Sequence, residues 1–379
     1  MKPILLFVVN DSWFFVSHRL PIAVAAIEDG YEVHVLAKED ETSRIIEDAG
    51  CHFLPWNLQP RGKTIFAEIR AFKEVYKNIR RIQPNIIHLV TIKSVIYGGL
   101  ASKLAGMKNV VIAVAGMGSM FDKDHPIIGK LQPIIRRLYK FSTSHPNNVF
   151  IFQNKTDKST FVKLFNLEER STRLFHGSGV DLDLFLTDGH EKSAVKVIMG
   201  ARLIEDKGVY EFIEAARIVK SKRPDVIFQI AGGALAKGHP GSVSLEELDK
   251  VNSNFEVEVL GHVNDMVPLL LSASIAVLPS YYNEGLPKFL AEAAASGLPA
   301  VTTDHPGCRD AVEDGATGLL VPIKNSKLLA SALLTLIDNE QLRQSMGERA
   351  RERAESYFDV EVIVQSHLNI YKGLINAQR

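Results

Sequence analysis

Short apolar runs rich in β-branched residues alternate with amphipathic stretches along the whole chain, and each run is long enough for only one strand. This alternation is typical of βαβ units, in which right-handed helical crossovers join parallel strands. In the first half, strands are predicted at Ile4–Val9, Glu32–Leu36, Ile86–Val90, Val110–Val114 and Val149–Phe152. Helices are predicted between them at Leu20–Asp29, Ile65–Ile82, Val95–Ala105 and Lys130–Phe141.

The same alternation restarts in the second half. Strands are predicted at Val195–Ala201, Val226–Ala231, Glu256–Leu260, Ile275–Pro279, Ala300–Thr302 and Gly318–Val321. Helices are predicted at Tyr210–Lys220, Leu245–Val251, Asn264–Ser272, Leu286–Ser296, Ser326–Leu336, Glu340–Glu355 and Val360–Ile375. A polar stretch without periodicity, Asp181–Ser193, separates the two series. We therefore expect an α/β protein with domains at 1–185 and 186–358, a last helix in 359–379, and a cleft between the two domains where ligands meet the carboxyl ends of the strands.

The composition fits two soluble domains, because hydrophobic residues make up 46% and charged residues 23% of the chain. The apolar run Ile4–Val9 is too short for a secretory signal, and no stretch approaches the length of a membrane span. Cys51 and Cys308 cannot form a disulfide framework, have no metal-ligand spacing around them, and fit a reducing compartment. We expect a cytoplasmic protein in which any membrane contact is peripheral.

The segment Tyr282–Glu292 follows a predicted strand and opens a predicted helix. Gly285 lets the backbone approach a ligand closely, and Pro287 suits a first helical turn, where no N–H donor is needed. Amides at a helix start bind anions, and the carboxylates of Glu284 and Glu292 make strong hydrogen bonds to sugar hydroxyls. Two glutamates at this spacing are common by chance. Their place after a strand, with the glycine, favours a site for a phosphate carried between two sugars.

A second candidate segment, Gly200–Gly208, runs from a strand into a loop that carries Arg202 and Lys207. Arginine presents a planar fork and lysine a point charge, so together they can neutralise a diphosphate that departs with negative charge. Either cation alone is more simply explained as an ordinary surface residue. The anion-binding helix start downstream favours the functional interpretation.

These segments belong to an ordered series of motifs that covers nearly all of the second half. The series consists of Gly177–Phe185, Gly200–Gly208, Ile230–Gly233, Leu260–Gly261, Leu278–Ser280, Glu284–Glu292, Ser296–Pro299 and Gly315–Val321. With these motifs the chain resembles a family 4 glycosyltransferase, whose GT-B fold consists of two facing Rossmann-like domains. The resemblance implies a retaining transferase that needs no metal and no cofactor beyond its nucleotide-sugar donor. It also implies that the last helix returns to the first domain.

The resemblance implies a role for each motif residue. Arg202 and Lys207 would bind the donor diphosphate, Glu284 would contact the transferred sugar, and Glu292 would hold the ribose hydroxyls. Further donor contacts are expected from Gly285, Leu286, Pro287, His262 and Val263. In the usual account of such enzymes the leaving phosphate helps to deprotonate the acceptor, so no general base is assigned. UDP is favoured over GDP by analogy alone.

The first half departs from the commonest pattern, in which a histidine stands near Ala115–Met117. Its segments Ser17–Ile22, Ile92–Ser94 and Gly116–Phe121 instead resemble the N-acetylgalactosaminyltransferases that act on diacetylbacillosaminyl-diphospho-undecaprenol. The resemblance implies an N-acetylhexosamine donor and a polyprenyl-diphosphate-linked saccharide acceptor, in cell-surface or protein-linked glycan synthesis. Acceptor-binding candidates are His18, Arg19, Lys93, Gly116 and Gly118. For His18, a satisfied helix-start histidine is an equal alternative.

Basic residues accumulate in the first half of the chain. Residues 1–190 hold 24 Lys and Arg against 19 Asp and Glu, whereas the remainder holds 20 against 25. The stretch Arg61–Arg81 interleaves basic and apolar residues at helical spacing, and Arg136, Arg137 and Lys140 form a second basic cluster. Such a surface suits anionic lipid, although an ordinary helix with a solvated basic face gives the same pattern. Because a polyprenyl acceptor requires membrane access, we expect peripheral association with the inner face of the plasma membrane, and no nucleic-acid partner.

Other two-domain α/β classes compete with this interpretation. A dinucleotide-binding dehydrogenase would carry G-x-G-x-x-G after the first strand, whereas this chain has Asn10-Asp11-Ser12-Trp13 there, which excludes that class. A non-hydrolysing nucleotide-sugar epimerase shares the architecture and the donor class. It stays as the nearest alternative, together with a transferase that uses a soluble or another lipid acceptor. A two-lobed sugar-binding protein normally lies outside the cytoplasm and would need a secretion signal.

Overall fold

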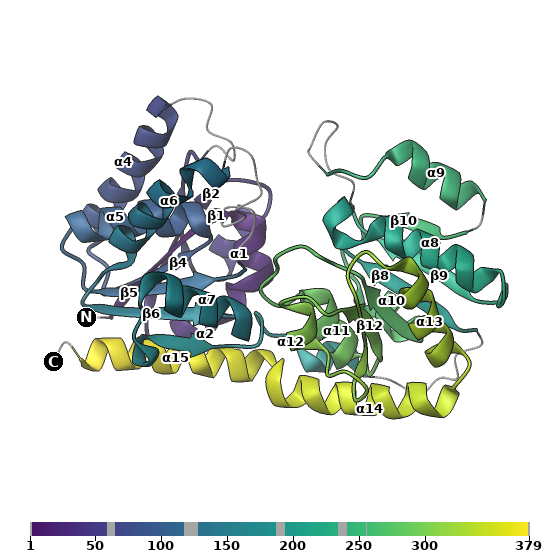
Figure 1. The fold of residues 1–379 in the computed structure, drawn as a ribbon. Helices are drawn as coiled ribbons and strands as arrows, with labels where there is room; N and C mark the ends of the chain where they lie inside the picture. The colour runs from purple at the N-terminus through teal and green to yellow at the C-terminus, as the bar shows by residue number, and fades with distance from the viewer. Residues whose placement is uncertain are drawn as a thin grey trace. The chain divides into compact units, whose positions relative to one another are not determined.

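The computed structural model describes residues 2–58, 65–116, 128–186, 194–233, 241–254 and 256–377. The chain divides into two compact units (Figure 1), one formed by Met1–Ser178 with Glu361–Arg379 and the other by Gly179–Val360. The first unit ends before the predicted boundary at residue 185. The reason is that Val180 forms a β-bridge with Asp359 and Phe185 is buried in the hydrophobic core of the second unit.

The first unit is built on a parallel sheet that has seven strands within the described residues, in the order β3-β2-β1-β4-β5-β6-β7. The strands are β1 (Ile4–Asp11), β2 (Glu32–Lys38), β3 (His52–Pro55), β4 (Ile86–Val90), β5 (Asn109–Val114), β6 (Asn147–Phe152) and β7 (Thr172–Leu174). All five strands predicted in this half are present. The two strands at the edges, β3 and β7, were not predicted.

Helices cover both faces of this sheet. They are α1 (Ser12–His18), α2 (Leu20–Glu28), α3 (Ser43–Asp48), α4 (Ile65–Ile82), α5 (Ile92–Leu104), α6 (Ile128–Thr143), α7 (Lys155–Phe165) and α15 (Val360–Asn376). Alternate residues of a strand face opposite sides of a sheet. Accordingly, Leu6 and Val8 lie in the core that α4 and α5 complete, whereas Phe7 packs on Phe15 of α1 with ring centroids 5.3 Å apart.

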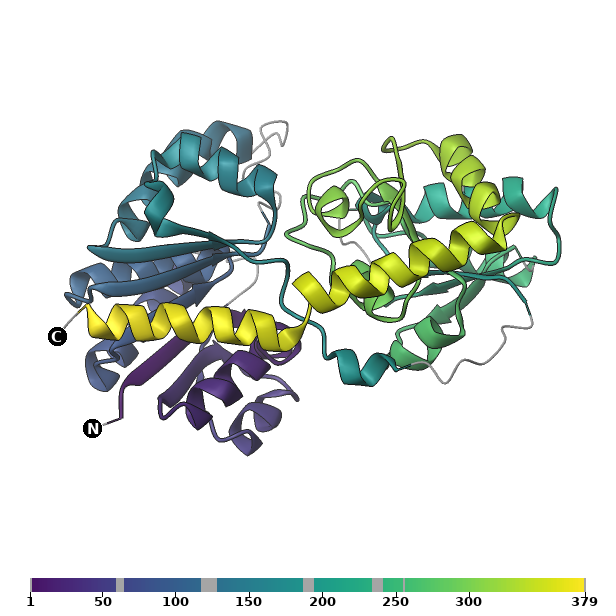
Figure 2. The same ribbon diagram turned by 90° about the horizontal axis from the view of Figure 1, so that it is seen from below.

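The last helix, α15, belongs to the first unit and runs along it (Figure 2). The hydroxyl of Tyr371 lies 2.7 Å from Nδ1 of His88 on β4, and Nζ of Lys372 lies 2.9 Å from Oδ1 of Asp29. Among the described residues, no helix combines the length and the apolar content that crossing a membrane requires.

The second unit has a parallel sheet in the order β10-β9-β8-β11-β12-β13, with six strands in the part of the chain that is described. The strands are β8 (Lys196–Gly200), β9 (Ile227–Ala231), β10 (Glu258–Gly261), β11 (Ile275–Leu278), β12 (Ala300–Thr303) and β13 (Gly318–Val321). The helices are α8 (Val209–Lys220), α9 (Leu245–Ser253), α10 (Val267–Ser272), α11 (Lys288–Ala295), α12 (Cys308–Ala311), α13 (Ser326–Ile337) and α14 (Glu340–Tyr357). One continuous hydrophobic core joins these elements.

Both sheets reverse their winding beside their first strand. In the first unit β1 lies between β2 and β4, and in the second unit β8 lies between β9 and β11. In open parallel sheets, ligands bind outside the carboxyl ends of the strands at such a reversal. We therefore expect a ligand site among the residues that follow β1, β4, β8 and β11.

Candidate functional site

The second unit brings two opposite charges together where its sheet reverses. The loops that follow the neighbouring strands β8 and β11 carry Lys207 and Glu284, respectively. Lys207 ends η4 (Glu205–Lys207), a single turn of 3-10 helix, and its Nζ lies 2.5 Å from Oε1 of Glu284. Their side chains are 9% and 14% exposed. The ion pair is thus largely shielded from water, yet both residues keep a surface that a ligand can reach.

Backbone and hydroxyl contacts hold the loop of Glu284 in place. The buried hydroxyl of Ser280 donates to Oε1 of Glu284 at 3.0 Å, and the amide of Tyr281 donates to the carbonyl of Asp206 at 2.8 Å. The second of these bonds ties the β11 loop directly to the β8 loop. Gly307, with φ of 85°, passes so close that a Cβ there would lie 2.9 Å from the carbonyl oxygen of Glu284. The carboxylate is therefore positioned by fixed neighbours.

Arg202 is exposed and belongs to the same group of charges. Its guanidinium carbon lies 5.7 Å from the ring centroid of Tyr282, and Nζ of Lys207 lies 5.4 Å from that centroid. An aromatic ring attracts cations through its face, so Tyr282 helps to hold two positive charges in one place. The sequence prediction did not include Tyr282 or Ser280 as site residues. The available signal was their position directly after a buried strand.

The helix start predicted as an anion site is present but begins at Lys288, not at Leu286. Pro287 has a ψ of 118°, which is extended, so it is the N-cap residue and does not lie in the first turn as predicted. Nζ of Lys288 lies 3.6 Å from Oε1 of Glu292, one turn along α11. Burial raises the pKa of Glu292, and Lys288 offsets part of that effect. Gly285 and Leu286 are buried directly before this helix start.

His262 and Val263 follow β10, at the same edge of the sheet. The amide of Gly232 donates to the carbonyl of Gly261 at 2.7 Å, which ties the end of β9 to the end of β10. Next to it, a Cβ on Gly233 would lie 3.6 Å from Nδ1 of His262. The loops after β8, β10 and β11 thus carry the predicted donor-binding residues, apart from Glu292, which lies in α11.

In the first unit, Asn10 near the end of β1 and Ser94 in the first turn of α5 connect two neighbouring elements. The hydroxyl of Ser94 donates to Oδ1 of Asn10 at 2.9 Å. Thr91, which precedes α5, has φ of 77°, a conformation that is costly for a β-branched residue and persists only where the surroundings enforce it. Nζ of Lys93 lies 3.1 Å from Oε1 of Glu68 on α4. The sequence prediction missed Asn10, although a polar residue directly after the apolar run Ile4–Val9 is a usable signal.

The predicted position of His18 and Arg19 needs a correction. They were expected at an acceptor surface beyond the end of the first strand, with His18 at a helix start as the alternative. Instead, His18 is the last residue of α1, a helix that was not predicted, and Arg19 links α1 to α2. His18 stacks on Phe14 with ring centroids 4.2 Å apart. Arg19 is 2% exposed and donates to the carbonyl of His18 at 2.8 Å, while its Nε is buried without a hydrogen-bond partner among the described residues. Burial lowers the pKa of Arg19 to about 10. Arg19 thus lies inside the first unit and not on a surface that an acceptor could contact.

Gly116 follows β5 with φ of 107°, in a region of backbone conformation that favours glycine. Because β5 neighbours β4, Gly116 lies at the same edge of the sheet as Lys93. Gly118 lies outside the described residues, as do Arg61 and Lys63 of the basic stretch.

Comparison with known proteins adds to this geometry. Residues 188–353 match the family model described as Glycosyl transferases group 1, and residues 4–154 match the one described as Glycosyl transferase 4-like. The N,N'-diacetylbacillosaminyl-diphospho-undecaprenol alpha-1,3-N-acetylgalactosaminyltransferase of Campylobacter jejuni is 29% identical, over 94% of this chain and 95% of that protein. The UDP-Gal:alpha-D-GlcNAc-diphosphoundecaprenol alpha-1,3-galactosyltransferase of Escherichia coli is 23% identical, over 91% and 90%. The crystal structure of Anabaena HepE with UDP and glucose matches with a TM-score of 0.80 at 19% identity, over 98% of this chain and 100% of that one.

Proposed function

Given that the chain belongs to the glycosyltransferases and has the GT-B fold, with a group 1 domain at residues 188–353, we propose that it is a retaining enzyme with a nucleotide-sugar donor. The observation that carries the proposal is the ion pair of Lys207 and Glu284 at the junction of β8 and β11, with Arg202 beside it. Release of a nucleoside diphosphate needs positive charge where the leaving group departs. A carboxylate next to that charge can hold sugar hydroxyls.

In the proposed reaction, the acceptor hydroxyl attacks the anomeric carbon on the face from which the leaving group departs. The bond from that carbon to the β-phosphate oxygen breaks, the glycosidic bond forms, and the departing phosphate oxygen takes the proton of the acceptor hydroxyl. Lys207 has three N–H donors, so it can bind the diphosphate and keep its contact with Glu284. With Arg202 it supplies the positive charge, so we propose transfer without a metal, a protein nucleophile or a cofactor.

The remaining donor contacts follow from position. The carboxylate of Glu292, half-buried on α11, suits the ribose hydroxyls, because partial burial strengthens its need for hydrogen-bond donors. The start of α11 suits a phosphate or a sugar oxygen. We assign further donor contacts to Gly285, Leu286, Pro287, His262 and Val263.

We propose UDP-N-acetylhexosamine as the donor and a polyprenyl-diphosphate-linked saccharide as the acceptor. The support is the relative from C. jejuni, which is named for transfer of N-acetylgalactosamine to a diphospho-undecaprenol-linked sugar and matches nearly the whole chain. The E. coli relative is also named for a diphosphoundecaprenol acceptor. Within this chain, Lys93, Gly116 and the exposed edge of His18 are the described residues that we assign to the acceptor.

A surface on the first unit supports access to a lipid-linked acceptor. α4 and α6 both pack on α5, and they expose Phe66 (82%) and Ile134 (63%) next to basic residues. Among the residues whose exposure is described, the exposed basic residues on these helices are Arg70, Lys73, Lys77, Arg80, Arg81, Arg137 and Lys140. Apolar side chains flanked by cations suit the interface of an anionic bilayer. We therefore propose peripheral binding to the membrane through α4 and α6.

Vesicle sedimentation tests this surface. The protein should bind vesicles that contain phosphatidylglycerol more tightly than vesicles of phosphatidylcholine alone, and Phe66→Ser should weaken the binding. Leu328→Ser is the matched control, because Leu328 is an exposed apolar residue on α13 of the second unit. Equal binding to both vesicle types, or equal loss in both variants, contradicts the proposed surface.

The proposed reaction is tested by following nucleotide release. Purified protein is incubated with UDP-N-acetylgalactosamine or UDP-N-acetylglucosamine, with a polyprenyl-diphosphate-linked saccharide, with the same saccharide free in solution, or with no acceptor. We expect UDP release that depends on the lipid-linked acceptor, and an α-linked product. If UDP is released with the free saccharide but not with the lipid-linked one, the acceptor is a soluble saccharide and the proposed lipid-linked acceptor is wrong. Formation of the epimeric nucleotide sugar without UDP release would point to the epimerase alternative.

A further inference from the structure

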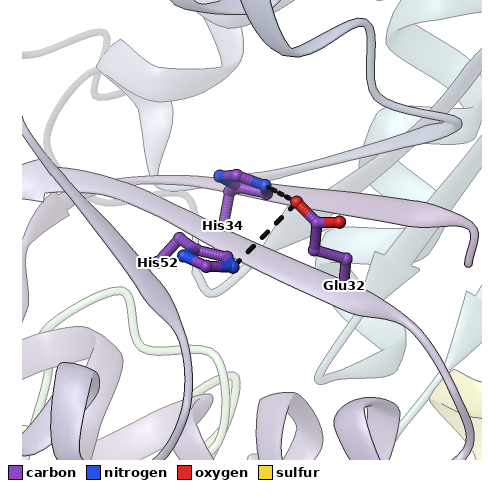
Figure 3. Close-up of side chains that lie close together, drawn as sticks. All are labelled: Glu32, His34 and His52. Atoms are coloured by element: carbon purple, nitrogen blue, oxygen red, sulfur yellow. Dashed lines mark hydrogen bonds and ion pairs between the residues drawn. The ribbon is translucent and has the colours of Figure 1, made fainter.

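Three side chains with metal-ligating atoms meet on β2 and β3 of the first unit (Figure 3). His34 and His52 occupy paired positions on these parallel strands, and Glu32 precedes His34 by two residues on the same face. Oε1 of Glu32 lies 2.8 Å from Nε2 of His34 and 4.0 Å from Nε2 of His52. One ligating atom from each residue lies within 4.8 Å of the others.

This cluster is separate from the proposed sugar-transfer residues. Glu32 and His52 are the first residues of β2 and β3, so the cluster lies toward the amino ends of these strands. The proposed acceptor residues Lys93 and Gly116 lie beyond the carboxyl ends of β4 and β5 in the same sheet. All strands of the sheet are parallel, so the cluster lies at the amino ends of the strands and the acceptor residues lie beyond their carboxyl ends. None of the three residues belongs to a motif that resembles the glycosyltransferases, and the proposed transfer reaction gives them no role.

The cluster can be reached from solvent. It lines an open pocket of about 600 Å³, to which Glu47, Cys51 and Arg81 also contribute. The side chains of Glu32 and His52 are 41% and 61% exposed, whereas that of His34 is largely buried. His34 is therefore a fixed point, and the other two side chains are free to rotate toward a common centre.

We propose that Glu32, His34 and His52 form a binding site for a divalent transition-metal ion such as Zn²⁺. Two imidazole nitrogens and one carboxylate oxygen are a ligand set of open zinc sites, in which water takes the fourth position. The ligating atoms all lie within 4.8 Å of one another, so small rotations of the two exposed side chains bring them onto one ion. The bound ion ties β3, an edge strand of four residues, to β2.

The surroundings of His34 also indicate how tightly the site binds the metal ion. A zinc ion on Nε2 leaves the ring proton on Nδ1, which is buried without a hydrogen-bond partner among the described residues. Zinc-binding histidines normally donate that proton to an acceptor, which raises their affinity. We therefore expect binding weaker than that of a structural site with four protein ligands.

The test uses the untagged full-length protein after treatment with a chelator. Titration calorimetry with Zn²⁺ should show one equivalent bound, and Co²⁺ should give the visible absorption band of a four-coordinate site. Glu32→Gln and His52→Asn should each weaken binding at least about tenfold, because even residues that only orient a ligand often contribute that much. Zn²⁺ should also raise the Tm of the parent protein, and do so less in both variants.

Glu28→Gln is the matched control, because Glu28 is an exposed carboxylate at the end of α2, outside the cluster. It should bind Zn²⁺ like the parent protein. The proposal is overturned if the parent protein takes up no stoichiometric Zn²⁺, or if both cluster variants bind it as tightly as the control. Because Glu32 and His52 are partly exposed, both substitutions should leave the protein folded, which circular dichroism checks.

Discussion

At the scale of single residues, Lys207 and Glu284 depend on one another. Both side chains are largely shielded from water. Nζ of Lys207 and Oε1 of Glu284 lie 2.5 Å apart, so each charge compensates the other. Glu284→Gln keeps a hydrogen-bond acceptor for Ser280 but removes the charge, and Lys207→Ala removes the cation that would face the diphosphate. We predict that each change lowers kcat/KM roughly 100-fold or more, which is the usual cost of losing a group that stabilises transition-state charge.

The control for these variants is Glu205→Gln, which removes an exposed carboxylate from the same turn of helix, η4. It should retain nearly full activity. Each site variant should lose about 1–3 kcal/mol of unfolding free energy, because a buried partner is left unsatisfied. The double variant should lose less than the sum, because both charges are removed together. Transfer rates within a few fold of the parent in both single variants would refute the site.

The residues of this site could be predicted better than their contacts. Arg202, Lys207 and Glu284 stand in loops next to glycines and after buried strands, which is a local signal. Their contacts with Tyr282 depend on the placement of β8 beside β11, which no local pattern encodes. Arg19 shows the opposite case. Arginine is rarely buried, so its sequence position suggests a surface cation, and only its burial, close enough to Tyr371 and His367 of α15 to interact electrostatically with them, reveals otherwise.

At the scale of elements, α15 places a buried histidine, His367, against a buried histidine of the first sheet, His88. The rings of His367 on α15 and His88 on β4 stack with centroids 5.7 Å apart. Burial, together with the charge of Arg19, lowers the pKa of His367 to about 3, and burial lowers the pKa of His88 well below its ordinary value. Both rings are therefore neutral in the folded protein at neutral pH.

This arrangement predicts a loss of stability in acid. In the unfolded chain the pKa of both histidines returns to about 6.5. As the pH falls from about 6.5 toward 3, the unfolded chain binds protons that the folded chain excludes, so the free energy of unfolding decreases. Urea denaturation at a series of pH values should show this decrease, and His367→Gln should make the pH dependence shallower. Tyr371→Phe should lower stability by a similar amount at each pH. An unchanged pH dependence in His367→Gln contradicts the assignment.

Elements with long periodic patterns were predicted well, and short edge elements were missed. The bounds predicted for α4, Ile65–Ile82, are confirmed, because its apolar and charged residues alternate over 18 residues at helical spacing. In contrast, β3 and β7 are only four and three residues long. Such strands exist because a neighbouring strand offers hydrogen bonds, and their own composition carries little signal.

At the scale of the whole molecule, contacts between distant parts of the sequence decide which residues fold together. The stretch Asp181–Ser193 is polar and without periodicity, so it predicts a linker. Yet Val180, directly before it, pairs with Asp359, and Phe185 within it enters the core of the second unit. The first unit likewise includes Glu361–Arg379, from the far end of the chain. A pattern within either half cannot report a contact that spans most of the sequence.

The discontinuous first unit makes a prediction about truncation. A chain that ends at Val360 keeps the complete second unit but loses α15, whose Leu368 and Tyr371 are buried against the first. Their loss exposes the sheet face that holds His88. The unfolding transition of the first unit should fall by at least roughly 10 °C, given the burial of several large side chains. Hydrogen exchange should show lost protection in β1 and β4 and retained protection in β8 and β11.

A chain that ends at Asn376 is the control and should match the parent protein, because α15 is then intact. Equal loss of protection in both units would mean that α15 does not belong to the first unit alone.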